Sequence, residues 1–105
     1  MSERGTSWDR TPRTLQQVRD FWIAEIRISP AMEQKIRSRR SLTGDDIRGA
    51  CIPDRYERAG WHFHPVHGRR LLVEAATLGG VRIRVILEPV SVSEGIWRLR
   101  TVLRY

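Results

Sequence analysis

Hydrophobic and polar residues alternate in several short stretches of this chain, and such alternation predicts β-strands with one buried face. The first stretch covers residues 23–28. Its side chains assigned to the buried face are Trp22, Ala24, Ile26 and Ile28. Further candidate strands cover residues 55–63, 70–77, 81–88 and 96–104, the first of these broken at Gly60. The pattern predicts a short N-terminal strand and, later, a three- to four-stranded, mainly antiparallel sheet.

Two helices are predicted between the first strand and the others. Ser29 can accept hydrogen bonds from the first turn of a helix, and Pro30 suits its first position, so a helix is expected over residues 30–40. A second helix begins at Thr43, whose hydroxyl can cap while Asp46 supports the first turn, and it ends before residue 53. The two helices form a hairpin, and the fold class is α+β.

Gly79 and Gly80 mark a turn between two strands. A two-residue loop would place Glu74 on the core face, whereas a three-residue loop over residues 78–80 places it opposite Arg84. The longer loop is predicted, because it keeps a charge out of the core and forms an oppositely charged pair. It also pairs Leu71, Val73, Ala75 and Thr77 with Leu87, Val85, Ile83 and Val81.

Arginines gather on one face of this predicted sheet. In the last strand the apolar face is expected to hold Trp97, Leu99, Thr101 and Leu103, with Arg98, Arg100 and Arg104 on the other side. The arginines expected to share a face across the strands are Arg70, Arg82, Arg84, Arg98 and Arg100. These guanidinium groups repel one another, and a phosphate backbone could relieve the repulsion by binding them. The alternative is that the arginine stems cover apolar surface beneath a partner element, with their heads in water or paired with Glu74 and Glu88.

Length and composition indicate one soluble domain. The chain has 105 residues, enough for one core, and we assign residues 1–13 to a flexible N-terminus and 14–105 to the domain, with a short helix over 14–21. Its charge of +7 favours acidic partners, although it can also serve solubility alone. A single cysteine, Cys51, and the lack of a long apolar run lead us to expect a cytoplasmic protein without membrane contact.

Three histidines lie close together in the segment 61–68. On a strand His62 and His64 share a face, and His67 can return from the following turn, so a metal site is conceivable. We expect no metal and no cofactor, because neither an acidic residue nor a cysteine lies beside the cluster. The imidazoles could instead act as general base or acid beside arginines. Cys51 is expected in the core, and Trp61 is the tryptophan considered for ligand contact.

The order of elements and two short motifs resemble a known family. Lys35-Ile36 lies in the first helix, and the second carries Leu42-Thr43-x-Asp45-Asp46-Ile47-Arg48. Over residues 24–104 the chain resembles the BrnT branch of the RelE-like bacterial toxin superfamily. The resemblance implies a RelE-like fold and a metal-independent endoribonuclease that cleaves messenger RNA. It also implies that the protein is the toxin of a toxin-antitoxin pair and that a small antitoxin-like partner protein neutralises it.

Candidate site residues follow from this resemblance together with the arginine pattern. Those expected in catalysis are His62, His64, Arg84 and Tyr105. Those expected to bind RNA are Arg39, Arg40, Arg70, Arg82, Arg98 and Arg100. The alternative is a non-catalytic module that binds nucleic acid or an acidic protein through the same face. The oligomeric state stays open.

Overall fold

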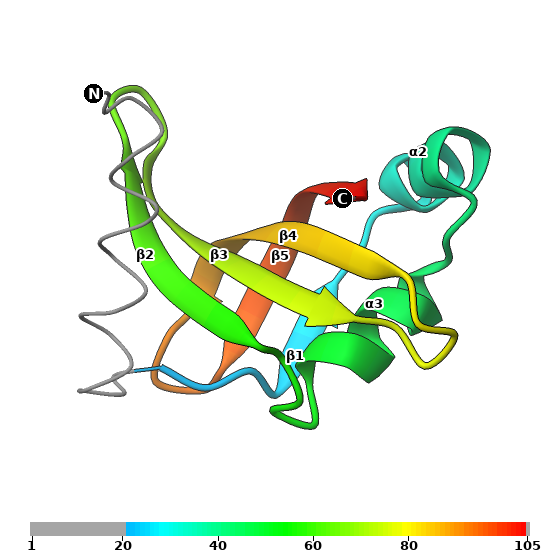
Figure 1. The fold of residues 1–105 in the computed structure, drawn as a ribbon. Helices are drawn as coiled ribbons and strands as arrows, with labels where there is room; N and C mark the ends of the chain where they lie inside the picture. The colour runs from blue at the N-terminus through cyan, green and yellow to red at the C-terminus, as the bar shows by residue number, and fades with distance from the viewer. Residues whose placement is uncertain (1–20, 105) are drawn as a thin grey trace, which may run out of the picture.

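The computed structural model describes residues 21–104 of the chain (Figure 1). The flexible segment predicted at 1–13, most of the helix predicted at 14–21, and Tyr105 lie outside the described residues. In chain order the elements are β1 (Glu25–Arg27), α2 (Pro30–Arg40), α3 (Gly44–Cys51), β2 (Arg58–His64), β3 (Gly68–Ala76), β4 (Arg82–Ser91) and β5 (Ile96–Arg104).

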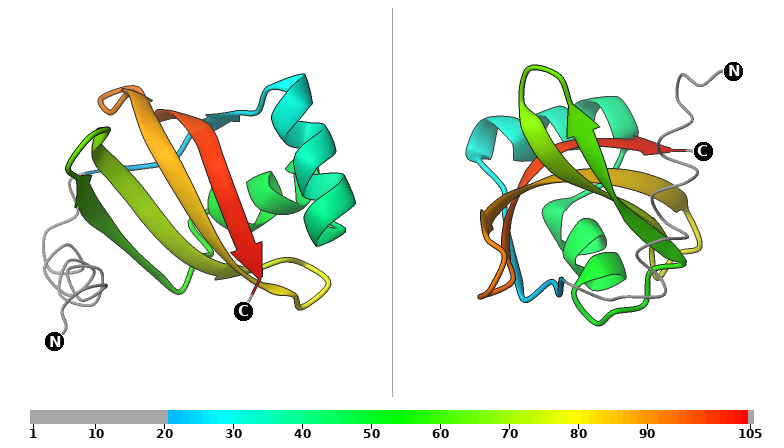
Figure 2. Two further views of the ribbon diagram at one scale, coloured as in Figure 1. Left: turned by 90° about the horizontal axis from the view of Figure 1, so that it is seen from above. Right: turned by 90° about the vertical axis from the view of Figure 1, so that its left-hand side faces the viewer.

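The strands form one five-stranded sheet in the order β1-β5-β4-β3-β2. β2, β3, β4 and β5 pair antiparallel, whereas β1 pairs parallel with the start of β5. Both helices lie on one side of this twisted sheet, with α2 beside β5 and α3 against β3 (Figure 2). The predicted α+β class is confirmed.

Both helices begin where the sequence predicts. The Ser29 hydroxyl accepts a hydrogen bond from the Met32 backbone at 3.1 Å, which caps α2. Thr43 and Asp46 cap α3 reciprocally, at 3.2 and 2.8 Å. Within residues 21–104 no helix is long and apolar enough to cross a membrane.

The hydrophobic core lies between the helices and the inner face of the sheet. Its largest fully buried side chains include Trp97, Ile26, Ile47, Leu71, Ile83 and Leu87. Cys51 is in this core as predicted, and burial raises the pKa of its thiol to about 12. A thiol with that pKa is not a nucleophile at neutral pH.

The predicted register of the β3–β4 hairpin is confirmed. Leu71, Val73 and Ala75 pair with Leu87, Val85 and Ile83, and Glu74 pairs with Arg84. The break predicted at Gly60 is wrong, because this buried glycine pairs with Leu72 inside an uninterrupted β2–β3 ladder.

The assignment of faces in β5 is wrong beyond Leu99. Leu99 pairs with Leu87 and Thr101 with Ile86, so Arg100 is one extra residue, a β-bulge. The bulge reverses the alternation that follows it. Val102 is therefore buried, while Leu103, predicted to be buried, is 39% exposed.

A similar irregularity corrects the first strand. The Gly95 carbonyl accepts hydrogen bonds from the backbone N–H groups of both Ala24 and Glu25, at 2.8 and 3.0 Å. Ala24 and Glu25 thus share one hydrogen-bond acceptor, which interrupts the alternation of faces. The buried side chain before this point is Ile23. Trp22, predicted in the core, is 53% exposed, and Ala24 is exposed as well.

Candidate functional site

The arginine-rich sheet face is the side of the sheet opposite the helices, and its arginines are paired with glutamates. Six arginines share three carboxylates on or beside it. The arginines are Arg58, Arg70, Arg82, Arg84, Arg98 and Arg100, and the glutamates are Glu57, Glu74 and Glu88. The pairing with Glu74 and Glu88 that was considered from the sequence is present. The set still keeps an excess of positive charge.

Glu74 is the most deeply placed of these carboxylates. It is 7% exposed and lies between Arg84, at 2.9 Å, and Arg58, at 3.1 Å. Burial alone would raise the pKa of Glu74, but the hydrogen bonds and charges of Arg84 and Arg58 outweigh burial and lower it. This part of the sheet face is therefore a structural ion-pair network.

Glu88 holds its arginines more loosely. It lies 3.3 Å from Arg70, 3.5 Å from Arg100 and 3.8 Å from Arg98. The Arg70 side chain is nearly buried, whereas those of Arg98 and Arg100 are 60% and 46% exposed. One carboxylate shared by three guanidinium groups leaves the two exposed ones available to a further anion.

The histidine cluster lies at the end of β2, where His62 and His64 are strand residues, and in the turn before β3, which holds His67. His64 Nδ1 accepts hydrogen bonds from the backbone N–H groups of Val66 and His67, at 3.0 and 3.1 Å. The rings of His64 and His67 lie 4.7 Å apart. In this arrangement the Nδ1 lone pair holds the turn and is not free to accept a proton from a substrate. Among residues 21–104 no three His, Cys, Asp or Glu side chains are placed to hold a metal ion.

We expect this turn to loosen in acid. Partial burial, followed by the nearby His67, Arg70 and His62, lowers the pKa of His64, so the folded state favours its neutral form. The stabilisation is then present above the ordinary histidine pKa of about 6.5 and is lost as the pH falls through that value to the folded one. Amide exchange at Val66, corrected for the intrinsic pH dependence, should accelerate over this range. In a His64→Leu variant the acceleration should be absent, and its persistence there would contradict the assignment.

Trp61, considered from the sequence for ligand contact, is 4% exposed. Its ring packs against Trp97 and Phe21, and the Arg69 guanidinium lies 4.0 Å from the ring centre. Trp61 therefore belongs to the core.

α2 covers an edge of β5. β1 pairs only with residues 96–98, so beyond them this edge faces the helix. Arg40 Nε donates a hydrogen bond to the Val102 carbonyl at 3.0 Å, and Arg104 donates to the Arg40 carbonyl, also at 3.0 Å. Arg104, predicted on the arginine-rich face, thus reaches the helix instead, because it follows the bulge.

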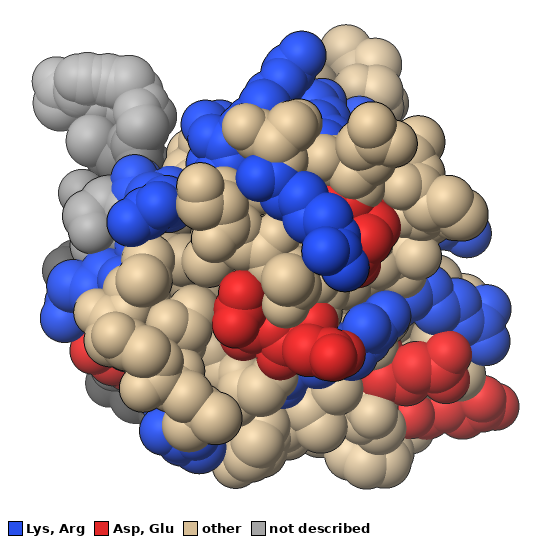
Figure 3. Space-filling view, turned by 90° about the vertical axis from the view of Figure 1, so that its right-hand side faces the viewer, with Lys and Arg blue, Asp and Glu red and all other residues tan. Residues whose placement is uncertain are grey.

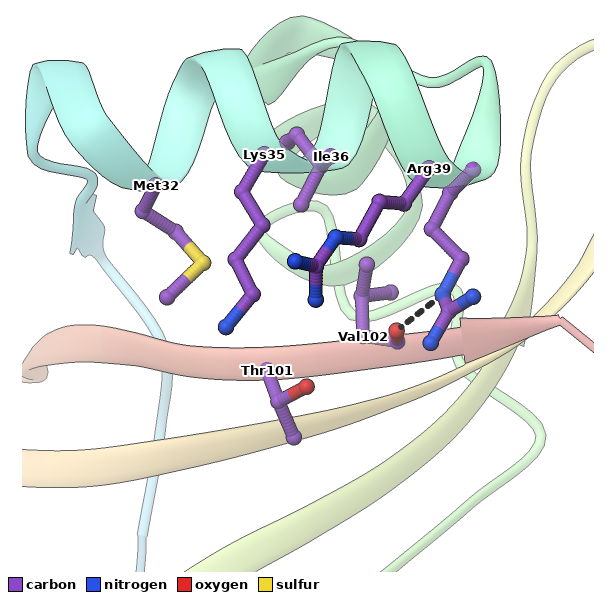
Figure 4. A pocket seen from close by; sticks show the side chains of 7 residues that line it. Met32, Lys35, Ile36, Arg39, Thr101 and Val102 are labelled. Carbon is purple, nitrogen blue, oxygen red and sulfur yellow. Dashed lines mark hydrogen bonds between the residues drawn. The ribbon is translucent and has the colours of Figure 1, made fainter.

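Two hollows open along this contact between α2 and β5. The first has a volume of about 20 Å³ and lies beneath the second half of α2 (Figure 4). Its lining residues are Met32, Lys35, Ile36, Arg39, Arg40, Thr101 and Val102. The side chains of Lys35 and Arg39, one helical turn apart, point from α2 toward β5. Neither charged head has an ion pair or hydrogen bond with the described residues.

The second hollow, of about 300 Å³, lies at the beginning of α2. Its lining residues are Arg27, Ile28, Ser29, Met32, Arg98, Leu99 and Arg100. Met32 lines both hollows, which therefore lie next to each other along the helix, and no described carboxylate lines either of them. We call this surface the basic seam, with the cations Arg27, Lys35, Arg39, Arg40, Arg98 and Arg100. From the α2 side, Lys and Arg gather in the upper part of the molecule, and the largest groups of Asp and Glu lie below them (Figure 3).

Comparison with known proteins does not identify a function for this surface. Comparison of the chain with protein-family models, curated proteins and solved structures finds no significant match. The resemblance to the BrnT branch stays a prediction, and the function has to be argued from the surface itself.

The structure divides the predicted RNA-binding residues between two places. Arg39 and Arg40 line the basic seam, and Arg98 and Arg100 line it as well while pairing with Glu88 of the arginine-rich face. Arg70 and Arg82 lie on the arginine-rich face with Arg84, His62 and His64, where Glu57, Glu74 and Glu88 hold the arginines. Sequence reasoning missed Arg27, whose place opposite Arg98 depends on the parallel pairing of β1 with β5. Lys35 had a detectable signal, its spacing of four residues from Arg39.

Proposed function

We propose that this protein binds single-stranded RNA, and that the basic seam holds the RNA backbone. The observation that carries the proposal is the pair of cations Lys35 and Arg39, which point into the same hollow and have no partner among residues 21–104, where no described carboxylate lines that hollow. Arginine binds phosphate oxygens in a bidentate manner, and lysine adds a point charge.

The shape of the seam favours a linear polyanion over a compact acidic protein. Its cations follow α2, an 11-residue helix, along a length of about 16 Å. The hollow beneath Lys35 and Arg39 is too small for a base, so contact with the backbone is expected there, without readout of sequence. The choice of RNA over DNA rests on the resemblance to the RelE-like toxins, and cleavage after binding would be the activity that this resemblance implies.

A double variant tests the seam. Lys35→Ala combined with Arg39→Ala should weaken binding of a labelled 12-nucleotide RNA roughly ten-fold at low salt. It should also reduce the slope of log affinity against log salt concentration by about 1.4, because two phosphate contacts are lost. Fluorescence anisotropy across a salt series measures both quantities.

The matched control removes the same charge elsewhere. Arg37→Ala with Arg82→Ala deletes two exposed arginines outside the seam. Equal weakening in both double variants would show that net charge alone drives binding and would contradict the proposal. Incubating the same samples in chelator and resolving the RNA on a gel reports cleavage, and a single-stranded DNA of the same sequence reports the choice of sugar.

A further inference from the structure

The larger hollow of the basic seam has the composition of an anion site. Arg27, Arg98 and Arg100 line it together, and its remaining wall is largely apolar, formed by Ile28, Met32 and other side chains. Three arginines that line one hollow suit an anion with several free oxygens.

The charges around the hollow are only partly neutralised. Arg27 has its own partner, Glu25, at 3.0 Å. Arg98 and Arg100 depend on Glu88, which also serves Arg70 at a shorter distance. A bound anion can therefore add to this arrangement without displacing a tightly held carboxylate.

The hollow also lies where the seam ends. The edge of β5 is open to α2 only after Arg98, because β1 occupies it before that point and places Arg27 opposite Arg98. A strand of RNA that follows α2 toward its beginning meets β1 and the chain leading to Ser29. The last nucleotide of such a strand reaches the hollow of about 300 Å³, where Ile28 and Met32 offer an apolar surface to its sugar or base.

We propose that this hollow binds a phosphate monoester, and that in the RNA complex the monoester is the terminal phosphate of the strand. A monoester carries a charge of about −1.5 to −2 at pH 7, whereas a backbone diester carries one negative charge, so three arginines favour the terminal group. The inference rests on the proposed function, since the seam must guide the strand to the hollow.

Three RNAs of one sequence test the proposal: one with a 5′-phosphate, one with a 3′-phosphate and one with hydroxyl groups at both ends. The RNA whose phosphate is at the end that reaches the hollow should bind roughly ten-fold more tightly than the RNA with hydroxyl groups at both ends. Arg98→Gln with Arg100→Gln should abolish this preference. Lys35→Ala with Arg39→Ala should weaken all three RNAs and keep the preference.

Equal affinity for the three RNAs would overturn the proposal while leaving RNA binding by the seam intact. A preference that survives in the Arg98→Gln, Arg100→Gln variant would overturn it as well. Titration with inorganic phosphate distinguishes a site for free phosphate from a site for the end of an RNA strand. Binding of inorganic phosphate at the hollow while no RNA binds would refute both the proposed function and the terminal-phosphate assignment. Circular dichroism of each variant, beside an Arg37→Gln, Arg82→Gln control, confirms that the sheet is retained.

Discussion

Replacing Trp97 with alanine should lower the free energy of unfolding by about 4 kcal/mol, because the large cavity left in the core cannot be filled by its neighbours. Trp97 is 0% exposed and packs against Trp61 and Phe21. Its Nε1 donates a hydrogen bond to the Trp22 carbonyl at 2.9 Å, which ties the chain before β1 to β5. Urea unfolding followed by circular dichroism measures the change.

A second substitution keeps this prediction testable if the alanine variant does not fold. Trp97→Phe retains much of the volume but loses the hydrogen bond, and it should cost about 1–2 kcal/mol. A loss below about 0.5 kcal/mol in both variants would show that Trp97 does not hold β1 against β5.

Glu74→Gln should be the most damaging change on the arginine-rich sheet face, with a loss of about 2–3 kcal/mol. The glutamate is nearly buried, so the change to glutamine removes the one carboxylate charge that Arg58 and Arg84 both contact in the sheet. The matched control is Glu57→Gln. Glu57 contacts Arg82 at only 2.6 Å, but both side chains are about half exposed, so this loss should stay below about 1 kcal/mol.

The pH dependence of stability gives an independent check on Glu74. Because Arg84 and Arg58 lower its pKa, its contribution is present above the ordinary glutamate pKa of about 4.3 and is lost as the pH falls through that value toward the folded one. The difference in unfolding free energy between the natural protein and Glu74→Gln should therefore shrink below about pH 4. A difference that is constant from pH 7 to pH 3 would exclude an ionic role for Glu74.

Local chemistry was sufficient to predict the helices and the β3–β4 hairpin. Ser29 and Thr43 cap helices through groups within three residues of themselves, so the signal lies in adjacent sequence. The hairpin register followed from one requirement, that Glu74 face Arg84 and not the core. The bulge at Arg100 and the shared hydrogen-bond acceptor at Gly95 could not be predicted, because neither irregularity has a sequence signature of its own.

The candidate site was predicted less completely than the fold. The sequence places Arg98 and Arg100 on a strand, but the hollow they line also needs Arg27 and Met32, which come from distant elements. The parallel pairing of β1 with β5 joins residues about seventy positions apart, and alternation within each strand carries no information on it. The arginine-rich face was recognised, yet its glutamates hold those arginines in ion pairs, whereas Lys35 and Arg39 of α2 have no partner within the described part of the chain.

Because of the β5 bulge, the pairing of β5 with β4 does not require Arg100. Every other residue of the strand sets the position of those after it, so its deletion would turn the rest of β5 over. Deleting Arg100 would instead close the ladder, with Leu99 and Thr101 as direct neighbours in their present registers. Arg100 has no pairing partner in the ladder between β4 and β5, and it lines the larger hollow. If the variant that lacks Arg100 folds but no longer binds the ligand of the larger hollow, Arg100 is required for binding and not for folding.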